Sequence, residues 1–272
     1  MSEIRTLVTG RGLVESPRWH GDRLYFSDWS AGEVLAVDPG GHTEVVARVR
    51  SLPLCTAWRP DGRLLIVSSA DGLLLRREPD GSLATEAELG PLAWNDIVVD
   101  GRGNAYVDSV SFDGSAPGTV HLVTPAGAVR EVTSELTFPN GMAATPDNGT
   151  LIVADSYAHA LVAFDIEADG DLANRRVWAD LGDGTPDGIC VDAAGAVWYA
   201  DVPNARCVRV AEGGAVLRTV DLDRGGFACV LGGTTLFVTA AQWRGMTEEE
   251  MVTPGSGQVL AIEVDVPGAG WP

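Results

Sequence analysis

Short apolar segments recur along the chain, and each one follows a polar tight turn. The first is Leu24–Asp28, with the sequence LYFSD, which follows the turn HGDR. The equivalent segments further along are Leu65–Ser69, Ala105–Ser109, Leu151–Asp155, Val197–Asp201 and Leu236–Ala240. Their first residues are 41, 40, 46, 46 and 39 positions apart. This spacing indicates six copies of one structural unit.

Each repeat also has an apolar segment before the turn and another further on. Ile189–Asp192 is an example of the former and Leu161–Phe164 of the latter. Repeats of about 40–50 residues with several strands each are typical of β-propeller blades, which stack around a central channel. We therefore predict an all-β fold, a six-bladed β-propeller in which residues 1–272 form a single domain. An irregular β-sandwich is the weaker interpretation.

Two segments fall outside the repeats. The opening segment Ile4–Val8 has no repeat of its own, and we expect it to supply the outer strand of the sixth blade. This strand would close the ring, because an open propeller would expose a strand edge. Met246–Met251, with the sequence MTEEEM, is expected to form a short helical turn within a loop.

The charge balance excludes several classes of partner. The chain has 19 Lys and Arg against 38 Asp and Glu, a net charge of −19, which would repel nucleic acids and anionic membranes. No signal-peptide pattern and no run of 18 apolar residues is present. We therefore expect a cytoplasmic protein with a small-molecule substrate and no nucleic-acid or membrane partner. Nothing in the sequence specifies an oligomeric state.

The cysteines give no sign of a disulfide framework or of a CxxC metal site. There are four, Cys55, Cys190, Cys207 and Cys229, and they are widely spaced along the chain. We interpret them as buried thiols in a reducing compartment.

One position of each repeat is expected to face the channel mouth. In a blade, the start of the first strand shares a rim with the loop after the second strand. The residues 9–11 positions before each second strand are Glu15, Cys55, Asn95, Asn140, Asp187 and Phe227. Four of them carry side-chain oxygens, which suit a hard divalent cation. The alternative, that Asn140-Gly141 and Asp187-Gly188 are only turn dipeptides, is weakened by their equivalent placement.

The segments around these residues resemble a known family. GLVESPRWHGDRLYFSDW, WNDIVVDGRGNAYVDS, FPNGMAATPDNGTLIVADS and TPDGICVDAAGAVWYAD are similar to the gluconolactonase, regucalcin and senescence-marker-protein family, over roughly residues 12–240. The resemblance implies a six-bladed propeller that holds a divalent metal at one end of its channel through a Glu, an Asn and an Asp. Many members hydrolyse lactones.

Carried over to this chain, the resemblance implies that Glu15, Asn140 and Asp187 are the metal ligands. Asn95 would lie beside the metal and contact substrate or a bound water, and Asp187 would also act as the acid and base. The two catalytic residues would thus be Asp187 and Asn95. Oxygen ligands favour Ca²⁺, while Mg²⁺, Mn²⁺ or Zn²⁺ could occupy the same site.

One departure from the family concerns the substrate. Members that hydrolyse sugar lactones carry an Arg two residues before the equivalent of Asn95, and here that position is Ala93, followed by Trp94. An Arg suits sugar hydroxyls or a carboxylate, whereas Ala and Trp suit an apolar body. We expect the substrate contacts to be Ala93, Trp94, Asn95 and Phe138, together with Phe112 and Trp243 from the two long rim loops. The rim aromatics could instead only pack their loops down.

These observations predict a metal-dependent hydrolase that opens the ring of a lactone more apolar than gluconolactone. Another metal-dependent reaction is the main alternative, such as phosphotriester hydrolysis, or an isomerase, lyase or cyclase reaction on a specialised metabolite. A non-catalytic calcium-binding protein is less favoured, because a scaffold needs no carboxylates at the channel mouth.

Overall fold

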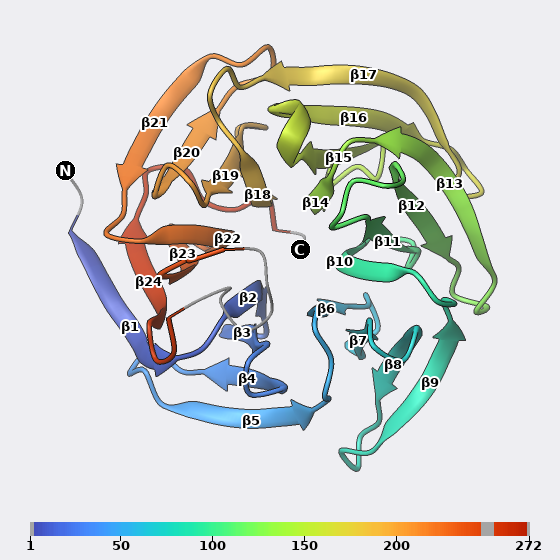
Figure 1. The fold of residues 1–272 in the computed structure, drawn as a ribbon, viewed down its shortest axis with the longest axis horizontal. Helices are drawn as coiled ribbons and strands as arrows, with labels where there is room; N and C mark the ends of the chain where they lie inside the picture. The colour runs from blue at the N-terminus through green and yellow to red at the C-terminus, as the bar shows by residue number, and fades with distance from the viewer. Residues whose placement is uncertain (1–2, 246–252, 271–272) are drawn as a thin grey trace.

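Six four-stranded antiparallel sheets surround a central channel in the computed structural model (Figure 1). The structure describes residues 3–245 and 253–270, so the expected turn at Met246–Met251 lies outside it. The sheets follow one another around the ring in chain order, which confirms the predicted six-bladed propeller. Within the described residues, no helix is both long and apolar enough to cross a membrane.

Blades 1 to 3 are each built from four consecutive strands. Blade 1 contains β2 (Val14–His20), β3 (Arg23–Asp28), β4 (Glu33–Val37) and β5 (Thr43–Arg48). Blade 2 contains β6 (Leu54–Trp58), β7 (Leu64–Ser68), β8 (Leu73–Arg77) and β9 (Leu83–Glu88). Blade 3 contains β10 (Ala93–Val99), β11 (Ala105–Val110), β12 (Gly118–Val123) and β13 (Val129–Leu136).

Blades 4 and 5 repeat this arrangement, and blade 6 combines both ends of the chain. Blade 4 contains β14 (Pro139–Ala144), β15 (Thr150–Asp155), β16 (Ala160–Ile166) and β17 (Leu172–Asp180), with a short 3₁₀ helix η1 (Ser156–Ala158) after β15. Blade 5 contains β18 (Pro186–Val191), β19 (Val197–Asp201), β20 (Arg206–Val210) and β21 (Val216–Asp221). Blade 6 contains β22 (Gly225–Gly232), β23 (Thr235–Ala241), β24 (Gly257–Glu263) and β1 (Ile4–Arg11).

The outer strand of blade 6 comes from the start of the chain. β1 pairs antiparallel with β24, with Ile4 opposite Ile262 and Thr6 opposite Leu260. The ring is therefore closed by hydrogen bonds between strands about as far apart in sequence as the chain allows.

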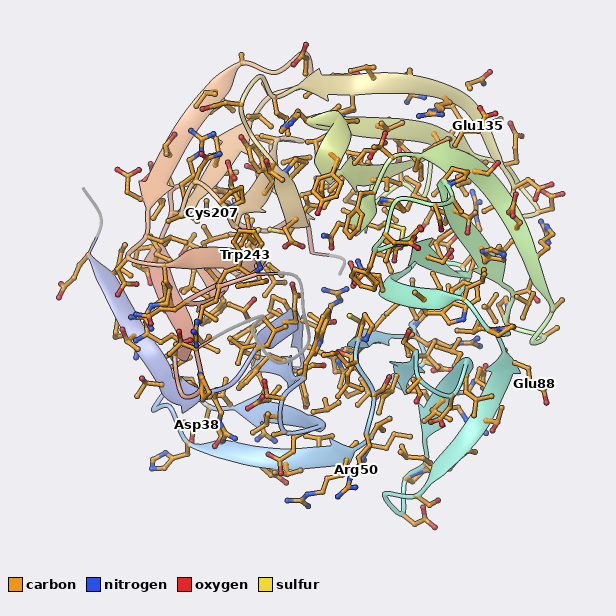
Figure 2. All side chains as sticks on the ribbon, viewed as in Figure 1. Asp38, Arg50, Glu88, Glu135, Cys207 and Trp243 are labelled. Carbon is orange, nitrogen blue, oxygen red and sulfur yellow. The ribbon has the colours of Figure 1, made fainter. Side chains whose placement is uncertain are left out.

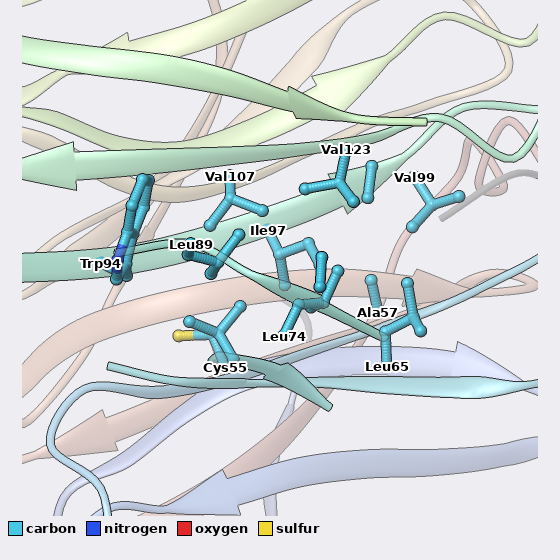
Figure 3. Packing of buried hydrophobic residues seen from close by; sticks show 13 residues of the cluster. Cys55, Ala57, Leu65, Leu74, Leu89, Trp94, Ile97, Val99, Val107 and Val123 are labelled. Atoms are coloured by element: carbon cyan, nitrogen blue, oxygen red, sulfur yellow. The ribbon is translucent and has the colours of Figure 1, made fainter. Parts of the chain in front are cut away.

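The hydrophobic core is divided among the interfaces between neighbouring blades. Between blades 2 and 3, Leu65 and Leu74 belong to the same buried group as Ile97 and Val107 (Figure 3). Corresponding groups of buried side chains lie between the other neighbouring blades. Each blade is thus held by apolar burial on both of its faces.

Five of the six inner strands contain a β-bulge beside the channel. The pairing with the second strand shifts between Glu15 and Arg18, Trp94 and Ile97, Pro139 and Met142, Pro186 and Ile189, and Gly226 and Ala228. A bulge inserts an extra residue and re-aims a side chain. In blade 2 the pairing of β6 with β7 is regular, with Cys55 opposite Val67. The bulges therefore coincide with the positions singled out in the other five repeats.

Gly141 and Gly188 allow the inner strands to approach one another. Both lie inside strands, β14 and β18, so the interpretation of their dipeptides as turns is wrong. A Cβ atom at Gly141 would lie 2.5 Å from the Cα of Gly188, and one at Gly188 would lie 2.2 Å from the Cβ of Ala228. The inner strands of blades 4, 5 and 6 are too close for a side chain at these two positions.

We predict that Gly188→Ala lowers the free energy of unfolding by about 1–3 kcal/mol, because the added methyl overpacks the contact with Ala228. Urea denaturation would measure the loss. Gly40→Ala is the matched control, since its Cβ would meet side-chain atoms of Asp38 and His42 on the surface. Equal midpoints for the two variants would contradict the prediction.

Candidate functional site

A cavity of about 150 Å³ opens at one end of the channel. Its lining residues from the starts of the inner strands are Glu15, Asn95, Asn140, Asp187 and Phe227. Those that follow the second strands include Trp29, Phe112, Tyr157, Val202 and Trp243. Among the described residues, blade 2 contributes none to this lining. The cavity thus lies on the rim expected from the propeller geometry.

Glu15 is held in place by a strained backbone conformation at the bulge of β2. Ser16 has a φ of 51°, the left-handed region that a serine seldom adopts, and its N–H donates to Oε2 of Glu15 at 2.5 Å. The Ser16 hydroxyl accepts a hydrogen bond from the N–H of Thr56 at 2.8 Å, which anchors the bulge to blade 2. Blade 2 therefore supports Glu15 without lining the cavity itself.

The amide of Asn140 is oriented by its neighbours. Its Oδ1 accepts a hydrogen bond from Nδ2 of Asn95 at 3.1 Å, and its Nδ2 lies 3.5 Å from the hydroxyl of Ser156. The Ser156 hydroxyl donates to the carbonyl of Pro186 at 2.6 Å, one residue before Asp187. Strands β10, β14 and β18 are therefore linked through Asn95, Asn140 and Ser156.

Buried carboxyl groups gather in this part of the channel. Burial raises the pKa of Glu15 to about 8. Burial also raises the pKa of Asp187 well above its usual range, and the charge of Glu15 raises it further. Asp108, which has no exposed surface, likewise has a pKa raised by burial and by the charge of Asp96. Too few positive charges and hydrogen-bond donors surround these carboxyl groups for all of them to be ionised at once.

These residues fit a divalent cation. Within the described part of the chain, Arg18 is the one cationic side chain that lines the deeper channel, and it is already paired with Asp96 at 2.9 Å. A bound cation would offset the remaining negative charge, and carboxylate and amide oxygens are the ligands that hard cations prefer. The described residues contain no group of three or more His, Cys, Asp or Glu placed to hold a metal. The candidate set instead joins the carboxylates of Glu15 and Asp187 to an amide oxygen of Asn140.

Aromatic side chains form one wall of the cavity. The rings of Phe112 and Phe138 are 5.9 Å apart, and those of Phe138 and Tyr157 are 4.6 Å apart. The carboxylate of Asp155 accepts the backbone N–H of Phe138 at 2.8 Å and so fixes the start of β14. Trp243, labelled near the middle of the ring in Figure 2, also lines the cavity. Phe112, Phe138 and Trp243 thus lie where substrate contacts were expected.

The expectation that Trp94 contacts substrate is corrected by the structure. Trp94 has no exposed surface and lies in the core between blades 2 and 3 (Figure 3). Its indole N–H donates to the carbonyl of Gly90 at 2.8 Å, and its ring packs edge-on against His121. Ala93 is half-buried and does not line the cavity either. Successive residues of a strand face opposite sides, so the segment that aims Asn95 at the channel turns Trp94 away from it.

We predict that Trp94→Phe lowers the free energy of unfolding by about 1–3 kcal/mol, because the smaller ring leaves a gap in the core and the half-buried carbonyl of Gly90 keeps only the N–H of Leu92 as a donor. The KM for any substrate should stay unchanged. Urea denaturation and steady-state kinetics on the same preparation would test this. A raised KM at unchanged stability would place the indole at the substrate instead.

A second cavity, of about 460 Å³, opens at the opposite end of the channel. Its lining includes Trp19, His20 and Trp58, and the rings of His20 and Trp58 are stacked 3.9 Å apart. Of the carboxylates and amides described above, none lines it. The larger cavity is therefore not where the candidate ligands converge.

Several residues of the site were not found from the sequence. Phe227 occupies the equivalent repeat position but carries no oxygen, so it was not assigned a role. Tyr157 follows the second strand of blade 4, just as Phe112 follows the second strand of blade 3. Its loop is short, and only the two long rim loops were expected to contact substrate. Ser156 and Asp108 give no sequence signal, because their contacts depend on strands from different blades or on a bulge.

Comparison with known proteins identifies the family. Residues 13–242 match the model of the SMP-30/Gluconolactonase/LRE-like region. A match over this much of the chain shows that the protein belongs to this family.

Curated relatives include two lactonases by name. Pentonolactonase XacC of Haloferax volcanii is 29% identical, and the alignment covers 100% of this chain and 97% of that protein. The 6-deoxy-6-sulfogluconolactonase of Pseudomonas putida is 26% identical, with 96% and 94% covered. Among solved structures, a calcium-binding protein, regucalcin, from Agrobacterium tumefaciens superimposes with a TM-score of 0.83 at 21% identity, covering 100% of this chain and 97% of that one. The last similarity supports the fold alone.

Proposed function

We propose that the protein is a metal-dependent hydrolase that opens the ring of a lactone. The observation that carries the proposal is the convergence of Glu15, Asn95, Asn140 and Asp187 on one cavity. The family and the relatives named as lactonases support the same reaction class. Glu15, Asn140 and Asp187 would hold the cation, with Ca²⁺ preferred and Mg²⁺, Mn²⁺ or Zn²⁺ as alternatives.

A divalent cation bound there would act as a Lewis acid toward the lactone carbonyl. Asp187 takes a proton from the attacking water as its oxygen bonds to the carbonyl carbon. When the bond between that carbon and the ring oxygen breaks, Asp187 returns the proton to the ring oxygen, which leaves as the hydroxyl of a hydroxy acid. Asn95 holds the attacking water or the oxyanion through its amide.

The cavity favours an uncharged substrate with an apolar body. Among the described residues, no Lys, Arg or His lines it, so a carboxylate, sulfate or phosphate substituent away from the metal would find no cationic side chain to pair with. Phe112, Phe138 and Tyr157 offer ring surfaces instead. A volume of about 150 Å³ suits a small lactone rather than a drug-sized molecule, for which pockets typically measure about 300–1,000 Å³.

We expect the protein to release protons from neutral lactones, followed with a pH indicator, when Ca²⁺ or Mn²⁺ is supplied, and to lose this activity in EDTA. A panel of sugar, aliphatic and aromatic lactones, including a sulfonated one, would rank the substrates. Turnover that resists EDTA would refute the metal dependence. Absence of turnover on every lactone by metal-loaded protein would favour phosphotriesters or another metal-assisted reaction.

We predict that Asp187→Asn lowers kcat by at least about 100-fold, because the amide cannot accept the proton of the attacking water. Asp183→Asn is the matched control, since Asp183 is exposed and its carboxylate pairs with Arg206 outside the cavity. Proton release under saturating substrate would measure both variants. An active, metal-replete Asp187→Asn protein would remove Asp187 from its role.

We predict that Phe112→Ala raises the KM for an aromatic lactone by about 3–10-fold, the value of one lost aromatic contact, with little change for an aliphatic one. Val177→Ala removes a more exposed apolar side chain from outer strand β17, away from the cavity, and serves as control. Equal effects on the two lactones would show that Phe112 only packs its loop.

A further inference from the structure

A buried ion pair crosses the channel just beyond the candidate ligands. Nη2 of Arg18 lies 2.9 Å from Oδ1 of Asp96, and the two side chains are only 9% and 11% exposed. Arg18 belongs to β2 of blade 1 and Asp96 to β10 of blade 3, so the pair spans blade 2. Blade 2 presents Cys55 at the equivalent position and supplies no oxygen ligand. The pair therefore joins two blades that are not neighbours in the ring, one with Glu15 and the other with Asn95.

Further hydrogen bonds extend this link on both sides. Nη2 of Arg18 also donates to the carbonyl of Ile97 at 2.7 Å. Oδ2 of Asp96 accepts the backbone N–H of Met142, on β14 of blade 4, at 3.3 Å. The carboxylate of Asp96 thus binds blade 1 through one oxygen and blade 4 through the other.

Each contact point lies close in sequence to a residue that lines the candidate cavity. Arg18 is three residues after Glu15, Asp96 directly follows Asn95, and Met142 is two residues after Asn140. These are also the positions where bulges interrupt the regular pairing with the second strand. The strand ladder leaves the backbone less constrained there, so another interaction has to fix the spacing of the ligands.

We propose that Arg18 and Asp96 are positioning residues, a clamp that sets the distances between Glu15, Asn95 and Asn140 for a divalent cation. This inference rests on the proposed function, in which these side chains surround the metal. Residues that orient the ligands of a metal site typically contribute about 10–100-fold to its affinity.

The charge of Arg18 acts in the opposite direction to the clamp. A guanidinium near the site repels a cation, so its removal would tighten metal binding if electrostatics were its whole effect. The clamp predicts weaker binding instead. The sign of the change in affinity after removal of Arg18 therefore separates the two effects.

Calorimetric titration with CaCl₂ and with MnCl₂ would test the clamp in the full-length protein. We expect Arg18→Met and Asp96→Asn each to weaken metal binding by about 10–100-fold. The double variant should bind about as weakly as either single one, because the same link is broken in each. Arg18→Lys keeps the charge and the fold but loses the forked donor, and it should also weaken binding.

Arg59→Met is the matched control for the loss of a buried ion pair. Arg59 pairs with Glu86 at 2.8 Å, with side chains 4% and 6% exposed, and neither residue lines the candidate cavity. This variant should lose stability in EDTA, measured by thermal unfolding, and keep the metal affinity of the wild type.

The outcomes separate the clamp from the proposed function. Tighter binding by Arg18→Met, or unchanged affinity in Arg18→Lys and Asp96→Asn, would overturn the clamp and leave the proposed function standing. If Arg59→Met lost as much metal affinity as Arg18→Met, general destabilisation would explain the loss in both variants. That result would also overturn the clamp. Wild-type protein that binds no divalent metal would overturn both.

Discussion

The close approach of the inner strands is the constraint on which the rest of the structure depends. At Gly141 and Gly188 the backbones of neighbouring blades meet with no room for a Cβ atom. Because the inner strands pack this closely around the axis, side chains from blades 1, 3, 4 and 5 reach one small cavity. The bulges beside these contacts then aim Asn95, Asn140 and Asp187 into the space that remains. Crowding at the axis and convergence of the candidate ligands are thus two results of the same geometry.

The site is held together against unfavourable local energetics. Ser16 adopts a left-handed backbone conformation, and buried carboxylates lie near one another with a single guanidinium among the residues that line the described channel. Strain and uncompensated charge of this kind persist only when the surrounding structure fixes them. The apolar interfaces between blades provide that support, because every blade is buried against two neighbours. Apolar burial between the blades thus offsets the unfavourable free energy of the site at the centre of the ring.

The repeat pattern predicted the fold closely, because the same pattern of a polar turn followed by an apolar strand recurs in the sequence of each blade. The predicted segment Val197–Asp201 has the same bounds as β19. The predicted segment Leu151–Asp155 starts one residue after the observed start of β15 at Thr150. The repeat also located Glu15, Asn95, Asn140 and Asp187, since equivalent positions in a propeller face the same rim. The expectation for Trp94 was wrong because successive residues of a strand face opposite sides, so the position next to Asn95 points into the core. The pair of Arg18 and Asp96 could not be found, because 78 positions separate the two residues and no local pattern links them.

The pairing of β1 with β24 also orders events during synthesis. β1 emerges from the ribosome before the other described strands, yet its hydrogen-bonding partner β24 begins at Gly257. At about 5–20 residues per second, the first strand waits on the order of tens of seconds before the ring can close. During that interval the nascent chain carries an unpaired strand edge and an unfinished circle of blades, the kind of surface that chaperones recognise. Blade 6 therefore lacks its full set of four paired strands until nearly all of the other strands have been made.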